Sequence, residues 1–212
     1  MTDLAVLAKT IEKGDRDAAV KETEKALGAG MSAEQIIIKG LQAGMGVVGE
    51  KFSSGEYFLP DMLLAARAMK ASLEVLKPLL VKTGMPTIGR VVVGTVEGDM
   101  HDIGKNIVAT FLSGSGFEVF DLGLNVSVKQ FIDAVKEKKP HIVGLSALLT
   151  TTMPNMGRII KTLAEEGLRA GVKVIVGGAP VTAHYARLIG ADAYARDGGE
   201  AIPACKKLVG KA

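Results

Sequence analysis

Strand and helix patterns alternate along the C-terminal part of the chain, and this alternation limits the folds open to it more than any other feature. Short runs rich in Val and Ile are separated by stretches whose apolar residues recur every three or four positions. The short runs are residues 91–96, 118–122, 141–146, 173–176 and 192–194, and the helical stretches are 103–112, 128–138, one from about Thr152, 182–189 and 199–209. Such alternation predicts an α/β fold, with a doubly wound, five-stranded parallel sheet of the Rossmann or flavodoxin-like type in strand order 2-1-3-4-5.

The N-terminal part of the chain shows helical spacing only. Apolar residues in steps of three and four follow one face of a long predicted helix over residues 59–80. Asp15 and Ser32 are typical helix starts, and residues 1–84 are long enough for four helices, which predicts an N-terminal four-helix bundle. The third predicted helix, residues 32–51, contains three glycines that we expect to allow close approach of a neighbouring helix: Gly40, Gly44 and Gly46.

The segment GMPTIG, residues 84–89, lies between these two patterns. It combines glycine and proline, which is typical of a boundary between domains. The predicted organisation is a helical domain over residues 1–84, a linker over 85–89 and an α/β domain over 90–212, and each domain is long enough to bury a core of its own.

Charge and composition exclude several classes of partner. The chain has 26 basic and 23 acidic residues, and its net charge of +3 is spread along the sequence, so we expect no nucleic-acid partner. No run approaches the roughly 20 apolar residues that span a bilayer, and the N-terminal segment does not resemble a signal peptide, so we expect no membrane association. Cys205 is the only cysteine, which indicates no internal disulfide and a cytoplasmic location.

The loops after predicted strands one, three and four carry the most distinctive residues of the chain. In the predicted strand order, ligands bind beyond the carboxyl ends of the strands, at the switch point between strands one and three. Imidazole is a good ligand for a transition metal, and a carboxylate two residues earlier is suited to hold the other ring nitrogen. The residues concerned are Asp99, His101 and Gly104, then Ser146 and Leu148, then Gly177 and Gly178.

Each of these residues also has a purely structural interpretation. An isolated Asp-x-His pair is compatible with a solvated loop histidine, and Ser146 with a hydroxyl that bonds local backbone at the end of a strand. The glycine pair is compatible with a tight turn that needs positive φ, and Gly104 is expected to let the backbone turn into the following helix. His141 and His184 are expected to be surface or core-edge residues.

Taken together, the three loops resemble the DxHxxG, SxL and GG signature of cobalamin-binding domains. They are EGDMHDIG at residues 97–104, Ser-x-Leu at 146–148 and Gly-Gly at 177–178. A four-helix module joined by a short linker to such a domain resembles the corrinoid proteins of methylamine, methanol, betaine and aryl-ether methyltransferase systems, which are related to the cobalamin module of methionine synthase. The segments SSGEYFLPDML, GTVEGDMHDIGKNIV and GGAPVT extend the likeness over essentially the whole chain.

The resemblance implies roles for individual residues. His101 would replace the dimethylbenzimidazole of cobalamin as the lower ligand of cobalt, which is the base-off, His-on form, and Asp99 and Ser146 would carry a proton relay behind it. The domain over residues 90–212 would contact the cofactor through Gly98, Asp99, Met100, His101, Asp102, Ile103, Gly104, Ser146, Leu148, Thr150, Gly177 and Gly178. The helical domain, residues 1–84, would cap the upper face of the corrin, with three candidate residues for that contact: Tyr57, Phe58 and Leu59.

The resemblance also implies a function. The chain would be a carrier and not an enzyme by itself. It would bind cobalamin, as methylcobalamin when charged, and pass the methyl group from a substrate-specific methyltransferase to an acceptor methyltransferase of the tetrahydrofolate or coenzyme M type, with a reductive activase as a further partner. The sequence does not name the methyl donor, because that specificity lies in the partner enzyme.

Two other classes of cobalamin protein share the three loops. A subunit of an adenosylcobalamin-dependent isomerase would need a barrel-bearing partner and does not ordinarily have a helical module in front; adenosylcobalamin as the preferred ligand would favour this reading. A cobalamin-sensing transcriptional regulator also pairs helices with such a domain. A regulator would also need a DNA-binding domain, which we do not recognise in this sequence. A gel shift with genomic DNA fragments would test this alternative.

Overall fold

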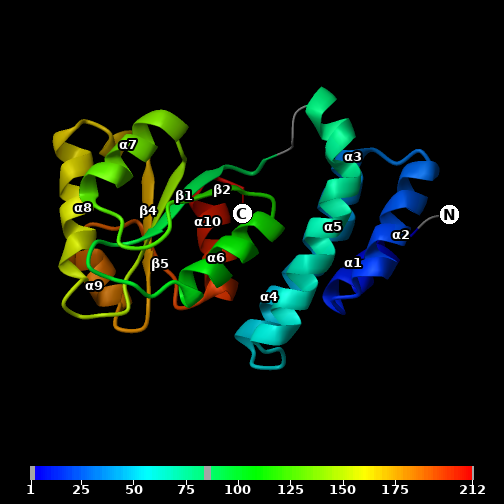
Figure 1. Ribbon diagram of the computed structural model, residues 1–212, viewed down its shortest axis with the longest axis horizontal. Coiled ribbons are helices and arrows are strands. Elements are labelled where there is room, and N and C mark those ends of the chain that lie inside the picture. Colours follow the sequence, from blue (N-terminus) through cyan, green and yellow to red (C-terminus); the bar gives the residue numbers. More distant parts are fainter. Residues whose placement is uncertain (1–2, 84–86, 212) are drawn as a thin grey trace. The chain divides into compact units, whose positions relative to one another are not determined.

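The structure, a computed structural model, describes residues 3–83 and 87–211 (Figure 1). They form two compact units, one made of Met1–Thr87 with Gly114–Gly116 and the other of Ile88–Ser113 with Phe117–Ala212. Residues 84–86 lie outside the described ranges, so the predicted linker over 85–89 is described only from residue 87 onward. The domain boundaries predicted from the sequence therefore stay a prediction.

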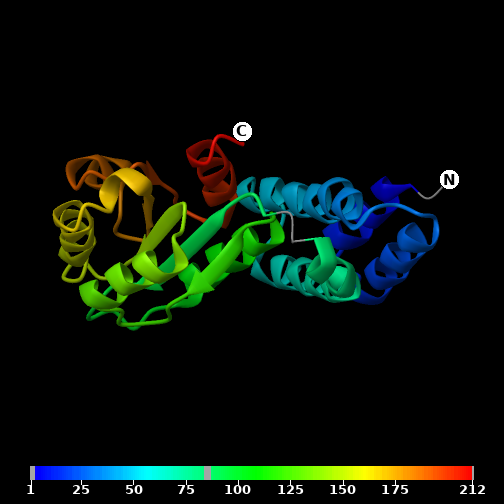
Figure 2. The same ribbon diagram turned by 90° about the horizontal axis from the view of Figure 1, so that it is seen from above.

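The first unit is helical, as predicted (Figure 2). Asp3 and Asp15 cap its first two helices, and Ser32 forms a capping box with Gln35, so three side chains satisfy backbone amides that the helix starts leave without partners. Two pairs of helices pack closely, α2 with α5 and α1 with α4. Its elements are α1 (Leu4–Glu12), α2 (Arg16–Gly28), α3 (Ala33–Ile36), η1 (Ile37–Gln42), α4 (Ala43–Ser53) and α5 (Leu59–Thr83).

The third predicted helix is continuous from α3 to α4 and contains one π-helical segment, η1. Two of its three glycines have the predicted role. A Cβ on Gly40 would lie 2.6 Å from the Leu7 side chain, and a Cβ on Gly44 would lie 2.5 Å from the carbonyl oxygen of Ala8. Gly46 differs, because a Cβ there would meet no atom within 4 Å. Close helix packing therefore explains Gly40 and Gly44 but not Gly46.

The second unit contains a five-stranded parallel sheet in the order β2-β1-β3-β4-β5, which confirms the predicted topology. Thr95 pairs with Ser146, and Ser146 pairs with Gly177, so the carboxyl ends of β1, β3 and β4 are level with one another. The three loops that carry the predicted site therefore start from one edge of the sheet. The strands are β1 (Arg90–Thr95), β2 (Glu118–Asp121), β3 (Ile142–Ser146), β4 (Lys173–Gly177) and β5 (Ala193–Tyr194).

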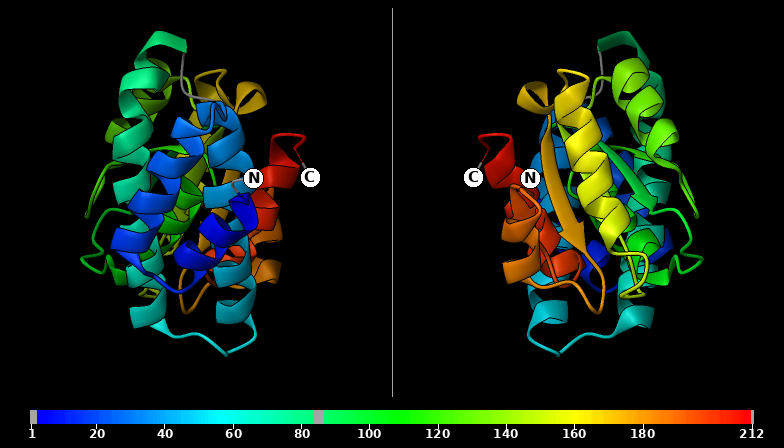
Figure 3. Two further views of the ribbon diagram at one scale, coloured as in Figure 1. Left: turned by 90° about the vertical axis from the view of Figure 1, so that its right-hand side faces the viewer. Right: turned by 90° about the vertical axis from the view of Figure 1, so that its left-hand side faces the viewer.

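Helices cover both faces of this sheet (Figure 3). Alternate residues of each strand point to opposite faces, so Val92 and Val143 pack under α7, α8 and α9, whereas Val91 and Ile142 pack under α6 and α10. The helices are α6 (Ile103–Gly114), α7 (Val128–Lys138), α8 (Pro154–Glu165), η2 (Arg169–Gly171), α9 (Ala183–Leu188) and α10 (Gly198–Leu208).

The helix predicted from about Thr152 begins at Pro154, which leaves Thr152 in the turn before α8. Among the described residues, no helix combines the length and the apolar character that crossing a membrane requires.

Candidate functional site

His101 and Asp99 form a close pair in the loop between β1 and α6. The Asp99 side chain is fully buried, the His101 side chain is 49% exposed, and the ring Nδ1 lies 2.8 Å from Asp99 Oδ1. An ionised carboxylate only accepts hydrogen bonds, so Nδ1 is the ring nitrogen that carries the hydrogen of this contact. The pair therefore leaves Nε2 as the ring nitrogen that can bind a metal.

The buried Asp99 carboxylate is held in its ionised form by the loops around it. Its Oδ2 accepts hydrogen bonds from the amides of Leu148 and Leu149 at 2.7 and 3.2 Å and from the Thr152 hydroxyl at 2.8 Å, and Oδ1 also accepts from the His101 amide at 3.1 Å. Burial by itself raises the pKa of Asp99, but the bonds from Leu148, the His101 ring and Thr152 outweigh it and hold the pKa well below its usual range. Asp99 is therefore ionised in the folded protein at neutral pH.

The hydroxyl that reaches Asp99 belongs to Thr152 and not to Ser146. Thr152 is 6% exposed, and its Oγ1 also lies 2.9 Å from the Leu149 carbonyl oxygen. Ser146 contributes its backbone, since its carbonyl oxygen accepts from the Val96 amide at 3.0 Å. Thr152 thus adds a hydroxyl at Asp99 that the sequence did not indicate, while the predicted role of Ser146 in the relay stays a prediction.

Several polar contacts that the sequence analysis did not identify hold the His101 loop in place. The Thr95 hydroxyl donates to the His101 carbonyl oxygen at 2.9 Å, and the Asn155 side chain donates to the Glu97 carbonyl oxygen at 2.8 Å. Asn125 accepts from the Gly98 amide at 2.7 Å through its side-chain oxygen. These residues come from β1, α8 and the loop after β2, and no local pattern in the sequence signals that they converge.

Exposed apolar side chains flank the imidazole. We call Met100, Ile103, Leu148 and Leu149 the His101 surface; they are 65%, 70%, 42% and 40% exposed. The bonds from Asp99 to Leu148 and Leu149 tie the loop after β3 to the loop after β1 and so bring the two halves of this surface together. Large exposed apolar residues gathered near a polar group are typical of a surface that binds a ligand or a partner.

Asp102 and Thr150, two other predicted contact residues, lie in the same two loops. Asp102 accepts a hydrogen bond from the Asn106 side chain at 2.9 Å, which orders the start of α6, and Thr150 is exposed. Both positions stay predictions as contacts to a ligand.

The glycines of the motif have different explanations. Gly178 has a φ of +123°, and a Cβ there would lie 1.9 Å from the Ala147 carbonyl oxygen; a Cβ on Gly177 would lie 2.7 Å from that of Ala195. Tight backbone packing therefore accounts for this pair without a ligand. Gly104 was expected to make the turn into α6, but it lies inside α6 without a positive φ; the positive φ of this loop, +83°, is at Gly98, in the turn that follows β1.

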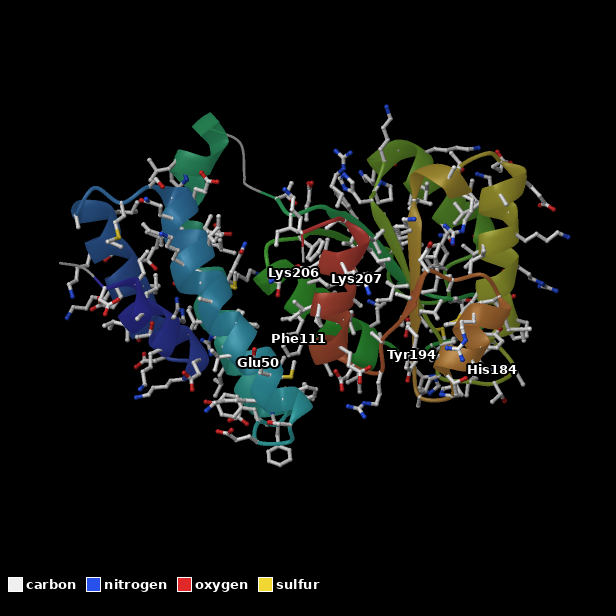
Figure 4. All side chains as sticks on the ribbon, turned by 180° about the vertical axis from the view of Figure 1, so that it is seen from behind. Glu50, Phe111, His184, Tyr194, Lys206 and Lys207 are labelled. Atoms are coloured by element: carbon white, nitrogen blue, oxygen red, sulfur yellow. The ribbon has the colours of Figure 1, made fainter. Side chains whose placement is uncertain are left out.

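A Cβ on Gly104 would meet no atom within 4 Å, so this position is open on the described structure. The remaining candidates lie elsewhere. His141 precedes β3 and accepts from the Arg90 amide at 3.0 Å, and His184 is an exposed residue of α9 (Figure 4). Cys205 is fully buried in α10, and burial raises the pKa of its thiol to about 12, so it is an inert core residue.

Two families of known domains match the chain. Residues 89–206 match a B12 binding domain, and residues 4–77 match a second family described as a B12 binding domain. The first match contains the three loops of the site, and the second contains most of the helical unit.

The chain is similar to curated corrinoid proteins over nearly its full length. It is 46% identical to trimethylamine corrinoid protein 2 of Methanosarcina mazei, over 96% of this chain and 94% of that protein, and 46% identical to dimethylamine corrinoid protein 1 of Methanosarcina acetivorans, over 97% of both.

Solved structures agree with these matches. A cobalamin-binding protein from Desulfitobacterium hafniense is 40% identical with a TM-score of 0.84, over 98% of this chain and 99% of that one. The methanol:cobalamin methyltransferase complex MtaBC from Methanosarcina barkeri contains a chain 31% identical with a TM-score of 0.85, over 99% of this chain and 80% of that one. The chain therefore belongs to the family of corrinoid proteins, which bind cobalamin through B12-binding domains.

Proposed function

We propose that this protein is a methyl carrier that binds cobalamin base-off, with His101 as the lower ligand of cobalt. The observation that supports this role most directly is the His101–Asp99 pair. The carboxylate holds Nδ1, so the nitrogen left for a metal is Nε2, on a half-exposed ring. The cofactor's own base must then leave the cobalt, because one lower position cannot hold two ligands.

The residues around His101 fit a corrinoid. A corrin ring has broad apolar faces, and the His101 surface offers four exposed apolar side chains beside the imidazole. The open position at Gly104 lets a ligand approach the start of α6 without meeting a side chain. When bound, the corrinoid supplies a cobalt centre that accepts and releases the methyl group, and the protein supplies binding and orientation.

Asp99 and Thr152 set the state of the imidazole. The ionised Asp99 fixes the ring orientation and makes Nε2 a stronger donor, while Thr152 and two loop amides keep the carboxylate from turning away. We propose the His101–Asp99 pair, with Thr152 behind it, as part of the proton relay predicted from the sequence, in which the place of Ser146 stays a prediction.

The partners follow from the named relatives. Those relatives are trimethylamine and dimethylamine corrinoid proteins, so we propose a methylamine methyltransferase as the donor enzyme. An acceptor methyltransferase, of the coenzyme M or tetrahydrofolate type, would take the methyl group, and a reductive activase would restore the cofactor after oxidation. The protein by itself would carry the group without catalysing its transfer.

We propose that the helical unit covers the methyl-bearing face of the cofactor. Phe58, at the start of α5, is 66% exposed and offers an aromatic ring for such a contact. Tyr57 is held differently, because the Lys51 ammonium lies 4.8 Å from the centre of its ring. Phe58 is therefore the stronger candidate of the two for contact with the cofactor.

The ligand assignment is tested by electron paramagnetic resonance. Wild-type protein reconstituted with cobinamide, which lacks the benzimidazole base, and reduced to Co(II) should show splitting from an axial protein nitrogen. His101→Ala should lose that splitting, and its control, His184→Ala, should keep it because His184 is an exposed residue of α9. A nitrogen signal that survives His101→Ala would overturn the assignment.

A further inference from the structure

Asn125, in the loop after β2, hydrogen-bonds two consecutive residues of the His101 loop. The Asn125 side-chain oxygen accepts a hydrogen bond from the Gly98 amide at 2.7 Å, and the Asn125 amide donates to the Asp99 carbonyl oxygen at 3.1 Å. Gly98 makes the turn that leads to Asp99, and Asp99 orients the imidazole. A single residue, far from His101 in sequence, thus fixes the backbone on which the proposed ligand depends.

Asn125 makes these contacts from an unfavourable backbone conformation. Among the described residues, only Asn125 and Lys139 combine a side chain with positive φ, at 49° and 45°. Lys139 ends α7, where a left-handed residue is a usual helix terminus, and its amide bonds the Val135 carbonyl oxygen at 3.0 Å. Asn125 ends no helix, so its conformation has another cause, and glycine would adopt it with less strain.

An ion pair braces the loop that carries Asn125. Lys105 in α6 has a side chain only 3% exposed, and its ammonium contacts both carboxylate oxygens of Asp121 at 2.7 and 2.6 Å. Asp121 in turn accepts from the Gly123 amide at 2.8 Å, and the Gly123 carbonyl oxygen accepts from the Thr95 amide at 3.0 Å. The loop is therefore anchored on both α6 and β1 before it reaches Asn125.

We propose that Asn125 is a positioning residue, which holds the His101 loop in the geometry that presents Nε2 to cobalt. This inference rests on the proposed function, because it needs His101 to be the ligand. Asn125 has a strained backbone, holds the His101 loop through its side chain, and lies in a loop that is itself anchored. This arrangement is expected of a residue that supports a metal ligand.

Three variants in the full-length protein test the proposal. Asn125→Gly keeps the backbone conformation accessible and removes only the side-chain acceptor. Asn125→Asp restores an acceptor oxygen at the same place. Lys139→Gly is the matched control, since it relieves the other positive φ at the end of α7.

The first measurement is the pH at which cobalt loses its axial nitrogen, followed by absorption spectroscopy of the reconstituted protein. Removing a partner that supports a metal ligand weakens ligation by about 10 to 100 fold. Since a proton competes with cobalt for Nε2, we expect Asn125→Gly to raise this midpoint by about 1 to 2 pH units. Asn125→Asp and Lys139→Gly should stay close to the wild type.

The second measurement needs no cofactor. Hydrogen exchange of the Gly98 amide should be faster in Asn125→Gly by about tenfold, the effect of losing one hydrogen bond, and unchanged in Lys139→Gly. The melting temperature of Asn125→Gly should change little, because relief of the strained φ offsets the lost hydrogen bond.

The outcomes separate this proposal from the proposed function. A wild-type midpoint in Asn125→Gly, or an equal shift in Asn125→Asp, would overturn the positioning role. If Asn125→Gly melts at a lower temperature, Asn125→Asp separates a lost positioning contact from general destabilisation. The positioning role requires that the restored acceptor oxygen of Asn125→Asp also restores the wild-type pH midpoint. An axial nitrogen that survives His101→Ala would instead refute the ligand assignment itself.

Discussion

At the scale of single residues, the main feature of the proposed site is the buried Asp99 carboxylate, which hydrogen bonds stabilise in its charged form. A buried carboxylate with no partners would take up a proton, but Asp99 is surrounded by donors and stays ionised. The proposed ligand His101 was evident from the sequence because its partner lies only two residues away. Thr152 was not, because its contact depends on how the turn before α8 is folded back onto the β1 loop.

Thr152→Val should therefore destabilise the protein, whereas Ser146→Ala should not. Valine keeps the shape but removes the hydroxyl, which leaves the buried Asp99 carboxylate with one donor fewer and costs about 1 to 3 kcal/mol of unfolding free energy at neutral pH. Urea denaturation measures the loss. Ser146→Ala is the matched control, with an expected change within about 0.5 kcal/mol.

The pH dependence of this difference has a definite sign. The folded protein depresses the pKa of Asp99, so its stabilisation is present above the unfolded pKa of about 4 and is lost as the pH falls toward the folded pKa. Thr152→Val should lower the pKa of Asp99 by less than the wild type does, because one of the hydrogen bonds that stabilise the carboxylate is lost. The stability gap between variant and wild type should therefore be widest at neutral pH and should shrink below about pH 4; a gap that widens there would contradict the assignment.

At the scale of elements, the same residue type has opposite roles within one helix. Gly44 lies where α4 crosses α1, since a Cβ would also lie 2.7 Å from Ile11 Cβ, whereas Gly46, two residues on, has open space beside it. Helical spacing alone indicated that these glycines are unusual. It could not say which of them face a neighbour, because that depends on the rotation of the helix in the bundle.

Gly44→Ala and Gly46→Ala should change stability in opposite directions. At Gly44 the new methyl group must push α1 and α4 apart, and such overpacking costs about 1 to 3 kcal/mol. At Gly46 alanine gains up to about 1 kcal/mol of helix propensity without a clash. Urea midpoints of the protein without cofactor measure both effects, and a loss of stability in both variants would mean that Gly46 is also in contact.

At the scale of the whole molecule, the proposed cofactor site lies within one unit and is separable from the helical unit. Every residue that bonds the Asp99 carboxylate belongs to the second unit, which has apolar cores on both faces of its sheet. The helical unit has its own buried core, which includes Leu7, Ile11 and Leu41. Each unit therefore has a core of its own, as the proposed division between holding and shielding the cofactor requires.

A fragment of residues 88–212 should fold and bind cobalamin with the same axial nitrogen as the full chain, because the proposed ligand set lies within it. If the helical unit covers the methyl group, methylcobalamin in the fragment should photolyse faster than in the full chain under the same light. Absorption spectra taken during illumination give both rates. Equal rates would show that the helical unit does not cover the methyl group, and would leave partner docking as its role.

The helices, the strands and their order could be predicted from local patterns in the chain. Strand and helix periodicity is a local property of the chain, and right-handed crossovers leave few ways to connect five parallel strands, so the order β2-β1-β3-β4-β5 could be predicted. The His101–Asp99 pair could be predicted for a similar reason, since both residues lie in one short loop. The resemblance of the three loops to the cobalamin-binding signature further predicted which cofactor the protein binds.

The side chains that reach the proposed ligand from distant parts of the sequence could not be predicted without the folded structure. Thr152 and Asn125 reach the His101 loop from two other loops, and the direction of a loop side chain depends on packing rather than on local pattern. Ser146 shows the same limit: level strand ends bring its backbone beside β1, and the predicted role of its hydroxyl in the relay stays a prediction. Local interactions follow from the order of residues, whereas convergence from separate loops follows from the folded chain alone.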